Sequence, residues 1–189
     1  MKTTLEIYEE FLTLSNQTLD VLNTNILINY PELSGNEYFH LTSGKEHYRL
    51  LIEISHHFNE EILFDIGTNR CMSAVALSVN KSNKIKSYDI IQILPENPKI
   101  DNVDFILGDS TKDTDLQKSR FIFLDVDHDG IYENILYDYL VSINWKGILV
   151  LDDIGLNDPM KSFWNRITQR KADLTSIGHW SGTGMVLFQ

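Results

Sequence analysis

The chain has 189 residues, of which 42% are hydrophobic and 23% are charged. A chain of this length can bury one sizeable core and is short for two full domains. Sixteen lysines and arginines stand against 27 aspartates and glutamates, which gives a net charge of −11. Because affinity for nucleic acids and for anionic membranes is built largely from Lys and Arg, this balance argues against both partners.

The chain contains one cysteine, Cys71, which excludes an intrachain disulfide framework and a multi-cysteine zinc site. No apolar run reaches the ~20 residues that span a bilayer. The acidic segment 1–14 lacks the apolar core of a signal peptide. The expected localisation is therefore cytoplasmic.

The first 58 residues are predicted to be mostly helical. Regularly spaced apolar residues indicate one amphipathic helix within residues 5–22, and a second is indicated over residues 45–58. We expect residues 1–58 to form a helical cap over a core of residues 59–189, the two together making a single domain 1–189.

Short apolar runs alternate with helical patterns in the rest of the chain. The predicted strands are 61–66, 84–89, 103–107, 120–125 and 146–151, followed by a terminal hairpin of 174–179 and 185–188. The predicted helices between them are 72–79, 131–143 and 161–170. Near-continuous apolar strands are typical of parallel strands buried on both faces. The pattern therefore predicts an α/β fold whose seven-stranded, mostly parallel sheet ends in a C-terminal antiparallel hairpin.

Open α/β sheets bind ligands at the carboxyl ends of their strands, so the residues placed there are candidates for a site. Asp65 and Gly67 follow the first strand, and Ser73 lies at the start of the next helix. Gly67 allows a tight turn and a close approach of the backbone to a ligand. Only the first glycine of the dinucleotide pattern G-x-G-x-x-G is present, so an ordinary strand-to-helix turn is the alternative interpretation.

The second and third strands also end in polar residues. Asp89 ends the second strand, where an acid can bind both hydroxyls of a ribose. The third strand leads into Asp109 and Ser110, where a polar group can meet an adenine amine. Acids at strand ends are common, and Asp109 can equally cap the helical segment that follows.

Acidic residues follow the fourth and fifth strands. If those strands are neighbours, Asp125, Asp152 and Asp153 converge at one edge of the sheet. Their oxygens suit Mg²⁺ or a similar divalent cation, which can orient a substrate hydroxyl and lower its pKa. His128 can act as a general base for that hydroxyl, or it can be a structural residue that caps the helix beginning near Gly130.

A second interpretation applies to the acidic loop 125–129. Residues 125–130 match the first half of an EF-hand loop, D-x-[DN]-x-[DN]-G. The twelfth position is Leu136 where a bidentate glutamate is required, and the preceding segment is a predicted strand. The alternative function is a non-catalytic module of the same fold whose acidic loop binds Ca²⁺ or a protein partner.

The order of these motifs resembles the class I S-adenosylmethionine-dependent methyltransferases. More narrowly, it is similar to the small-molecule O-methyltransferases related to catechol O-methyltransferase, including members with Asp-x-x-His and Asp-Asp-Ile motifs. Here those motifs occupy 125–128 and 152–154, and the segments 43–48 and 182–184 are also similar. The resemblance runs from about residue 42 to the C-terminus and implies a Rossmann-like sheet.

The resemblance also implies an activity and a set of residues. The activity is transfer of a methyl group from S-adenosylmethionine to a hydroxyl of a small-molecule acceptor, and a homo-oligomer is compatible with it. The residues implied in cofactor binding are Asp65, Gly67, Ser73, Asp89, Asp109 and Ser110. Asp125 and His128 are implied in catalysis, and Asp125, Asp152 and Asp153 in holding Mg²⁺ or a similar cation.

Two residues depart from the pattern of the similar enzymes, and one histidine has two interpretations. Cys71 stands where this branch usually has glycine, so we expect its side chain to crowd the cofactor turn. Asp153 stands where the catechol enzymes have asparagine, which makes the cation site more acidic. His47, one turn from Ser43, either faces the cofactor or packs in the cap.

Overall fold

The computed structural model describes residues 2–33 and 36–189. The helices of the described part are α1 (Thr4–Phe11), α2 (Asn16–Leu19), α3 (Tyr48–His57), α4 (Met72–Leu77), α5 (Ile131–Ser142) and α6 (Asp158–Arg166), with 3₁₀ turns η1 (Asn25–Asn29), η2 (Glu37–His40) and η3 (Ser110–Lys112). Its strands are β1 (Ile62–Ile66), β2 (Lys84–Asp89), β3 (Val103–Leu107), β4 (Phe121–Leu124), β5 (Gly147–Asp152), β6 (Arg170–Asp173) and β7 (Thr183–Phe188).

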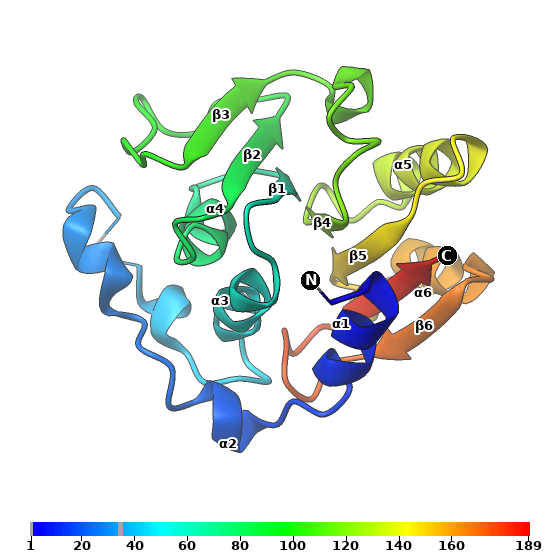
Figure 1. The fold of residues 1–189 in the computed structure, drawn as a ribbon, viewed down its shortest axis with the longest axis horizontal. Coiled ribbons are helices and arrows are strands. Elements are labelled where there is room, and N and C mark those ends of the chain that lie inside the picture. The colour runs from blue at the N-terminus through cyan, green and yellow to red at the C-terminus, as the bar shows by residue number, and fades with distance from the viewer. Residues whose placement is uncertain (1, 34–35) are drawn as a thin grey trace.

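The strands form one seven-stranded sheet in the order β3-β2-β1-β4-β5-β7-β6 (Figure 1). The first five strands in chain order pair in parallel, and β7 is antiparallel to both β5 and β6. The predicted fold class is thus confirmed. The order reverses between β1 and β4, which is the point where open α/β sheets bind ligands.

Successive residues of each strand enter different hydrophobic cores, because side chains alternate between the two faces of a sheet. Leu63 packs in the cluster that contains residues of α1, α3 and α4, whereas Phe64 packs in the cluster of α5 and α6. Figure 1 shows these two groups of helices on opposite sides of the row of strands. Burial on both faces explains why the central strands β4 and β5 are apolar almost throughout.

The predicted single helix within residues 5–22 is wrong, because a second capping box, at Ser15, divides it into two helices. Thr3 accepts from the backbone N–H of Glu6 and starts α1, and Ser15 accepts from Thr18 and starts α2. A side chain that caps a helix holds its own backbone in an extended conformation, which breaks any helix continuing from before it.

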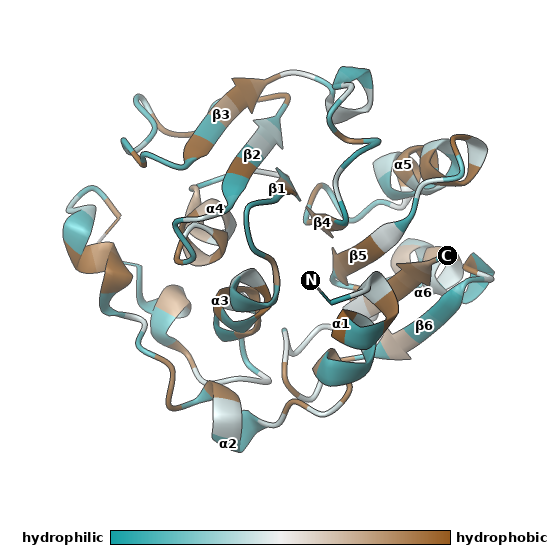
Figure 2. Cartoon of the chain, viewed as in Figure 1, coloured by the Kyte–Doolittle hydropathy of each residue, from teal (hydrophilic) through white to brown (hydrophobic). Residues whose placement is uncertain are grey.

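The predicted strand 174–179 is also wrong: this segment forms turns, and the edge strand is Arg170–Asp173 instead. The predicted helix 161–170 is shifted. The helix α6 begins earlier, at Asp158, because Asn157 caps it, and it ends at Arg166, before β6 begins at Arg170. Figure 2 shows β6 as largely hydrophilic. Polar edge strands are common because they discourage pairing with other chains, but hydrophobic periodicity does not reveal them.

The cap and the strands contribute to the same core. Ile7 and Phe11 of α1 and Leu50 of α3 lie in one cluster with Leu63 and Phe121 of the sheet. Within the described residues, no helix has both the length and the apolar character needed to cross a membrane.

Candidate functional site

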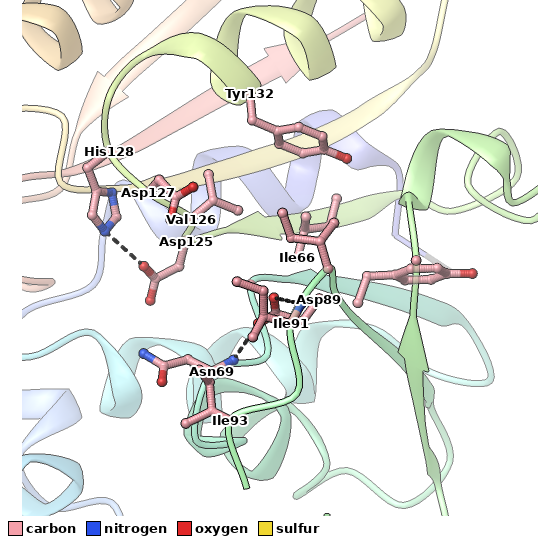
Figure 3. A pocket seen from close by; sticks show the side chains of 14 residues that line it. Ile66, Asn69, Asp89, Ile91, Ile93, Asp125, Val126, Asp127, His128 and Tyr132 are labelled. Atoms are coloured by element: carbon pink, nitrogen blue, oxygen red, sulfur yellow. Dashed lines mark hydrogen bonds and ion pairs between the residues drawn. The ribbon is translucent and has the colours of Figure 1, made fainter.

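Two adjoining cavities lie at the carboxyl ends of the parallel strands. The first, of about 290 Å³, is bordered by the ends of β1, β2 and β4 and by Tyr132 (Figure 3). The second lies between the end of the sheet and the cap, with His47 and Asp152 in its wall. Gly67 and Asp125 border both cavities, so the two are parts of one site.

Gly67 stands where β1 and β4 approach most closely. Its φ is +104°, and a Cβ built there would lie 1.6 Å from the carbonyl oxygen of Asp125. Its N–H donates to the carbonyl of Tyr88 at 2.8 Å. No side chain fits this position, so the glycine is required by the backbone as well as by any ligand.

Asp65 lies beneath this turn and is fully buried, outside the linings of both cavities. One carboxylate oxygen accepts from Ser87 Oγ at 2.6 Å, and the other has no hydrogen-bond partner among the described residues. Burial raises the pKa of Asp65 to about 7. Ser73, at the start of α4, does line the second cavity.

Asp89 lies in the first cavity, at the end of β2. Its Oδ2 accepts the N–H of Asn69 at 2.9 Å and its Oδ1 accepts that of Ile91 at 3.0 Å (Figure 3). Each oxygen keeps a lone pair for a further donor. Ile90, Ile91 and Ile93 form an apolar border to this cavity and are 69%, 60% and 51% exposed.

Asp109 and Ser110 do not line the first cavity but contact Tyr132, which does. Ser110 Oγ lies 3.1 Å from the Tyr132 hydroxyl. Asp109 accepts the N–H of Thr111 at 3.0 Å and so caps η3. This pair is therefore connected to the first cavity through Tyr132.

The expectation that Cys71 crowds the cofactor turn is wrong. The residue has a positive φ of 67°, a backbone conformation that favours glycine. Its side chain, however, is fully buried in the hydrophobic cluster and lines neither of the two cavities described above. Burial raises the pKa of this thiol to about 12.

Asp125, Asp152 and Asp153 converge, as the parallel pairing of β4 and β5 predicts. His128 links two of them: its Nε2 lies 3.2 Å from Asp125 Oδ1 and 3.3 Å from Asp153 Oδ2. Figure 3 shows Asp125 and His128 together, apart from Asp89. The α5 helix has Gly130 at its N-cap with no side-chain cap bond, so His128 does not cap it.

Two more histidines complete the acidic cluster. His47 Nδ1 lies 3.3 Å from Asp152 Oδ1, and its Nε2 lies 4.0 Å from Asp125 Oδ2. His179 Nδ1 lies 3.3 Å from Asp152 Oδ2 and 3.1 Å from Asp153 Oδ1. Each of the three imidazoles thus lies between two of the three carboxylates.

This alternation shifts the pKa of both kinds of group. Burial would lower the pKa of His128, but its contact with Asp125 raises it to about 9. Burial would likewise lower the pKa of His179, and its contact with Asp152 raises it to about 10. Burial would raise the pKa of Asp152, yet the charge of His47 and the contact with His179 hold it well below its usual range.

Buried atoms without hydrogen-bond partners make the cluster compatible with a bound cation. Both ring nitrogens of His47 and Oδ1 of Asp152 are buried and lack hydrogen bonds within residues 2–33 and 36–189. Groups whose ligand atoms lie within 4.8 Å of one another include His47–Asp125–Asp152 and His128–Asp152–Asp153. A divalent ion would satisfy the carboxylates that the imidazoles otherwise neutralise.

The EF-hand interpretation is not favoured. Asp129 accepts the N–H of Ile131 at 2.8 Å and is used at the start of α5. Among the described residues, no group with ligand-like spacing combines Asp125 with Asp127 or Asp129.

His179 and Glu46 were missed as candidate residues at the level of sequence. His179 lies in the turn before β7, and β7 pairs antiparallel with β5, so that Asp152 is opposite Thr183. The start of a strand antiparallel to β5 necessarily lies beside the end of β5. That pairing is the signal that could have placed His179 beside Asp152.

No family model matches the sequence, and no curated protein matches it. Similar folds occur among solved structures. An SAH-bound methyltransferase from Podospora anserina has a TM-score of 0.58 at 11% identity, covering 100% of this chain and 98% of its own. A methyltransferase from Geobacter sulfurreducens has a TM-score of 0.56 at 13% identity, with coverage of 100% and 99%. An O-methyltransferase from Bacillus cereus in complex with SAH has a TM-score of 0.55 at 13% identity, with coverage of 97% and 96%. This chain therefore has the fold of these Rossmann-like methyltransferases over its whole length.

Proposed function

We propose that this chain is an S-adenosylmethionine-dependent methyltransferase that acts on a hydroxyl of a small molecule with the help of a divalent cation. The observation that carries the proposal is one site with two parts: a cavity beside Gly67 and Asp89 opens onto the cluster of Asp125, Asp152 and Asp153. The S-adenosylhomocysteine (SAH) named in two of the similar structures supports the choice of cofactor.

The first cavity offers the groups that this cofactor needs. Asp89 keeps lone pairs for the two ribose hydroxyls, and Ile91 and Ile93 provide apolar surface for a purine. Gly67 leaves the end of β1 open to the methionine portion, and Asp65 supports that turn from below. When bound, the cofactor would supply a sulfonium methyl group, whose carbon forms a bond to the acceptor oxygen as its bond to sulfur breaks and S-adenosylhomocysteine leaves.

Most of the rate enhancement would come from positioning, because holding two reactants in line replaces a bimolecular encounter. Asp125, Asp152 and Asp153, which all line the second cavity, would hold a divalent cation, and such an ion lowers the pKa of a coordinated hydroxyl. His128 would act as the proton acceptor, because it contacts Asp125 and Asp153 and borders both cavities. Because Asp125 favours its protonated form, the base form of His128 grows as the pH rises toward 9.

The second cavity is the place for the acceptor. Cap residues Asn36, Tyr38 and Tyr48 border it, together with Arg70 and Met72 beyond β1. The aromatic rings from the cap suit a compact acceptor with an apolar body and a hydroxyl directed at the acidic cluster. Cytoplasmic location and a homo-oligomeric state stay predictions, which fractionation and light scattering test.

Isothermal titration with SAH tests the proposal. We expect micromolar binding by the wild-type chain and roughly 10–100-fold weaker binding by Asp89→Asn, since a hydrogen bond to a charged group contributes about 1.5–3 kcal/mol. Asp104→Asn is the matched control, because Asp104 is an exposed acid on the neighbouring strand β3, paired with Lys84. Absence of binding at millimolar SAH, or equal weakening by both variants, contradicts the proposal.

A further inference from the structure

The cap brings nitrogen ligands to a cluster for which oxygen ligands alone would suffice. Glu46 and His47 come from the segment just before α3, and His179 comes from the turn before β7. One ligand atom from each of the three lies within 4.8 Å of the others, and His179 Nε2 is 3.7 Å from Glu46 Oε1. Two imidazoles and a carboxylate thus meet on the cap side of the second cavity.

His47 is the residue that points to a ligand. Its exposed fraction is 2%, and neither ring nitrogen has a hydrogen-bond partner in the described part of the chain. Its Nδ1 lies 3.3 Å from Asp152 Oδ1, which also lacks a hydrogen bond. A buried imidazole normally donates from one nitrogen and accepts at the other, so an unpartnered one calls for a missing group.

The imidazole and carboxylate ligands restrict which kind of metal ion can bind here. Mg²⁺ and Ca²⁺ are bound in proteins by oxygen ligands and water. Imidazole nitrogen suits zinc, iron, nickel and copper, and two histidines with one carboxylate are a recurrent ligand set for first-row divalent metals. The side chains of Glu46, His47 and His179 are 13%, 3% and 16% exposed, which limits competition from water.

We propose that Glu46, His47 and His179 form a mixed nitrogen–oxygen metal site that binds a first-row transition-metal dication such as Zn²⁺ in preference to Mg²⁺. Any role of this metal in methyl transfer rests on the proposed function. The preference of the site for Zn²⁺ over Mg²⁺ does not. Because Glu46 and His47 belong to the cap and His179 to the turn before β7, the ion would also tie the cap to the sheet.

Metal titration of chelator-treated protein tests this site, with Zn²⁺ and Mg²⁺ as the two probes. We expect the wild-type chain to bind Zn²⁺ at least about 100-fold more tightly than Mg²⁺. His47→Gln and His179→Gln should each weaken Zn²⁺ binding by roughly 10–100-fold. His56→Gln is the matched control, since His56 lies on α3 but is exposed and outside the cluster, and it should bind Zn²⁺ as the wild type does.

Circular dichroism and SAH titration on the same samples separate the possible failures. If His47→Gln does not fold, His179→Gln decides, because His179 lies at the rim with a side chain 16% exposed. Zn²⁺ preference without SAH binding supports this inference and contradicts the proposed function, and SAH binding without the preference does the reverse. Equal affinity for Zn²⁺ and Mg²⁺, or Zn²⁺ binding unchanged in His179→Gln, overturns the site.

Discussion

The two halves of the ligand-binding edge are built on different principles. The half formed by β1, β2 and β3 consists of backbone turns, apolar side chains and the carboxylate of Asp89, which lines the first cavity. The half formed by β4, β5 and the start of β7 places three histidines among three aspartates. The shape of the backbone therefore determines which substitutions the first half tolerates, whereas the balance of charges determines which substitutions the second half tolerates. Substitutions that add atoms should harm the first most, and substitutions that remove charge should harm the second most.

The largest effect is expected from Gly67→Ala, which tests the dependence of the first half on shape. The added Cβ would lie 1.6 Å from the Asp125 carbonyl, so the chain must move one of its central strands. We expect a loss of about 4 kcal/mol or more in the free energy of unfolding, measured by denaturant titration.

Gly108→Ala is the control for this prediction. Gly108 also has a positive φ, of +157°, but a Cβ there meets no atom within 4 Å. Backbone strain alone should cost roughly 1 kcal/mol. Similar losses in the two variants would show that the approach of β1 to β4 is not what restricts the site.

Asp152→Asn tests the charge balance of the second half. Asp152 is buried with His47 and His179, and removing one partner of a buried ion pair costs roughly 3–5 kcal/mol. We expect about 3 kcal/mol at pH 7 in metal-free protein, shrinking below pH ~4, where the unfolded chain protonates its carboxyl groups. Asp138→Asn removes an exposed acid paired with Arg166 and should cost less than ~1 kcal/mol. Equal losses would contradict a tightly coupled cluster.

Asp65→Asn should have a smaller effect that depends on pH. Because burial raises the pKa of Asp65 to about 7, the folded chain keeps a proton that the unfolded chain releases near pH 4. This contribution to stability is present below pH ~4 and is lost as the pH rises through 7. The wild type should therefore lose roughly 1–3 kcal/mol more than Asp65→Asn between pH 5 and pH 7. Parallel stability curves for the two proteins would contradict an ionisable, buried Asp65.

The fold and half of the site could be predicted because their signals are local. The central parallel strands carry their own apolar runs. Asp125 directly follows β4 and Asp152 ends β5, so the pairing of these neighbouring strands suffices to bring them together. The polar strand β6 carries no such run and was misplaced. The positions of Asp65 beneath the turn and of Asp109 behind Tyr132 depend on side-chain direction, which spacing does not give.

The positions of the histidines could not be predicted from the sequence either. His47 and His179 are far apart in the chain, and only the packing of the cap and the antiparallel pairing of β7 bring them to Asp152. No motif spacing records a contact of that kind. The two histidines distinguish this site from a cation site made of carboxylates alone. Their place beside Asp152 follows from the three-dimensional structure and not from the sequence.

A crystal structure of the chain with SAH and Zn²⁺ tests the central claim most directly. The account predicts SAH in the first cavity, with its ribose on Asp89 and its sulfur directed toward Asp125 and His128. It also predicts anomalous scattering from Zn²⁺ within bonding distance of His47 and His179. SAH bound elsewhere, or an empty cavity in crystals grown at millimolar SAH, would contradict the assignment of this edge of the sheet to methyl transfer.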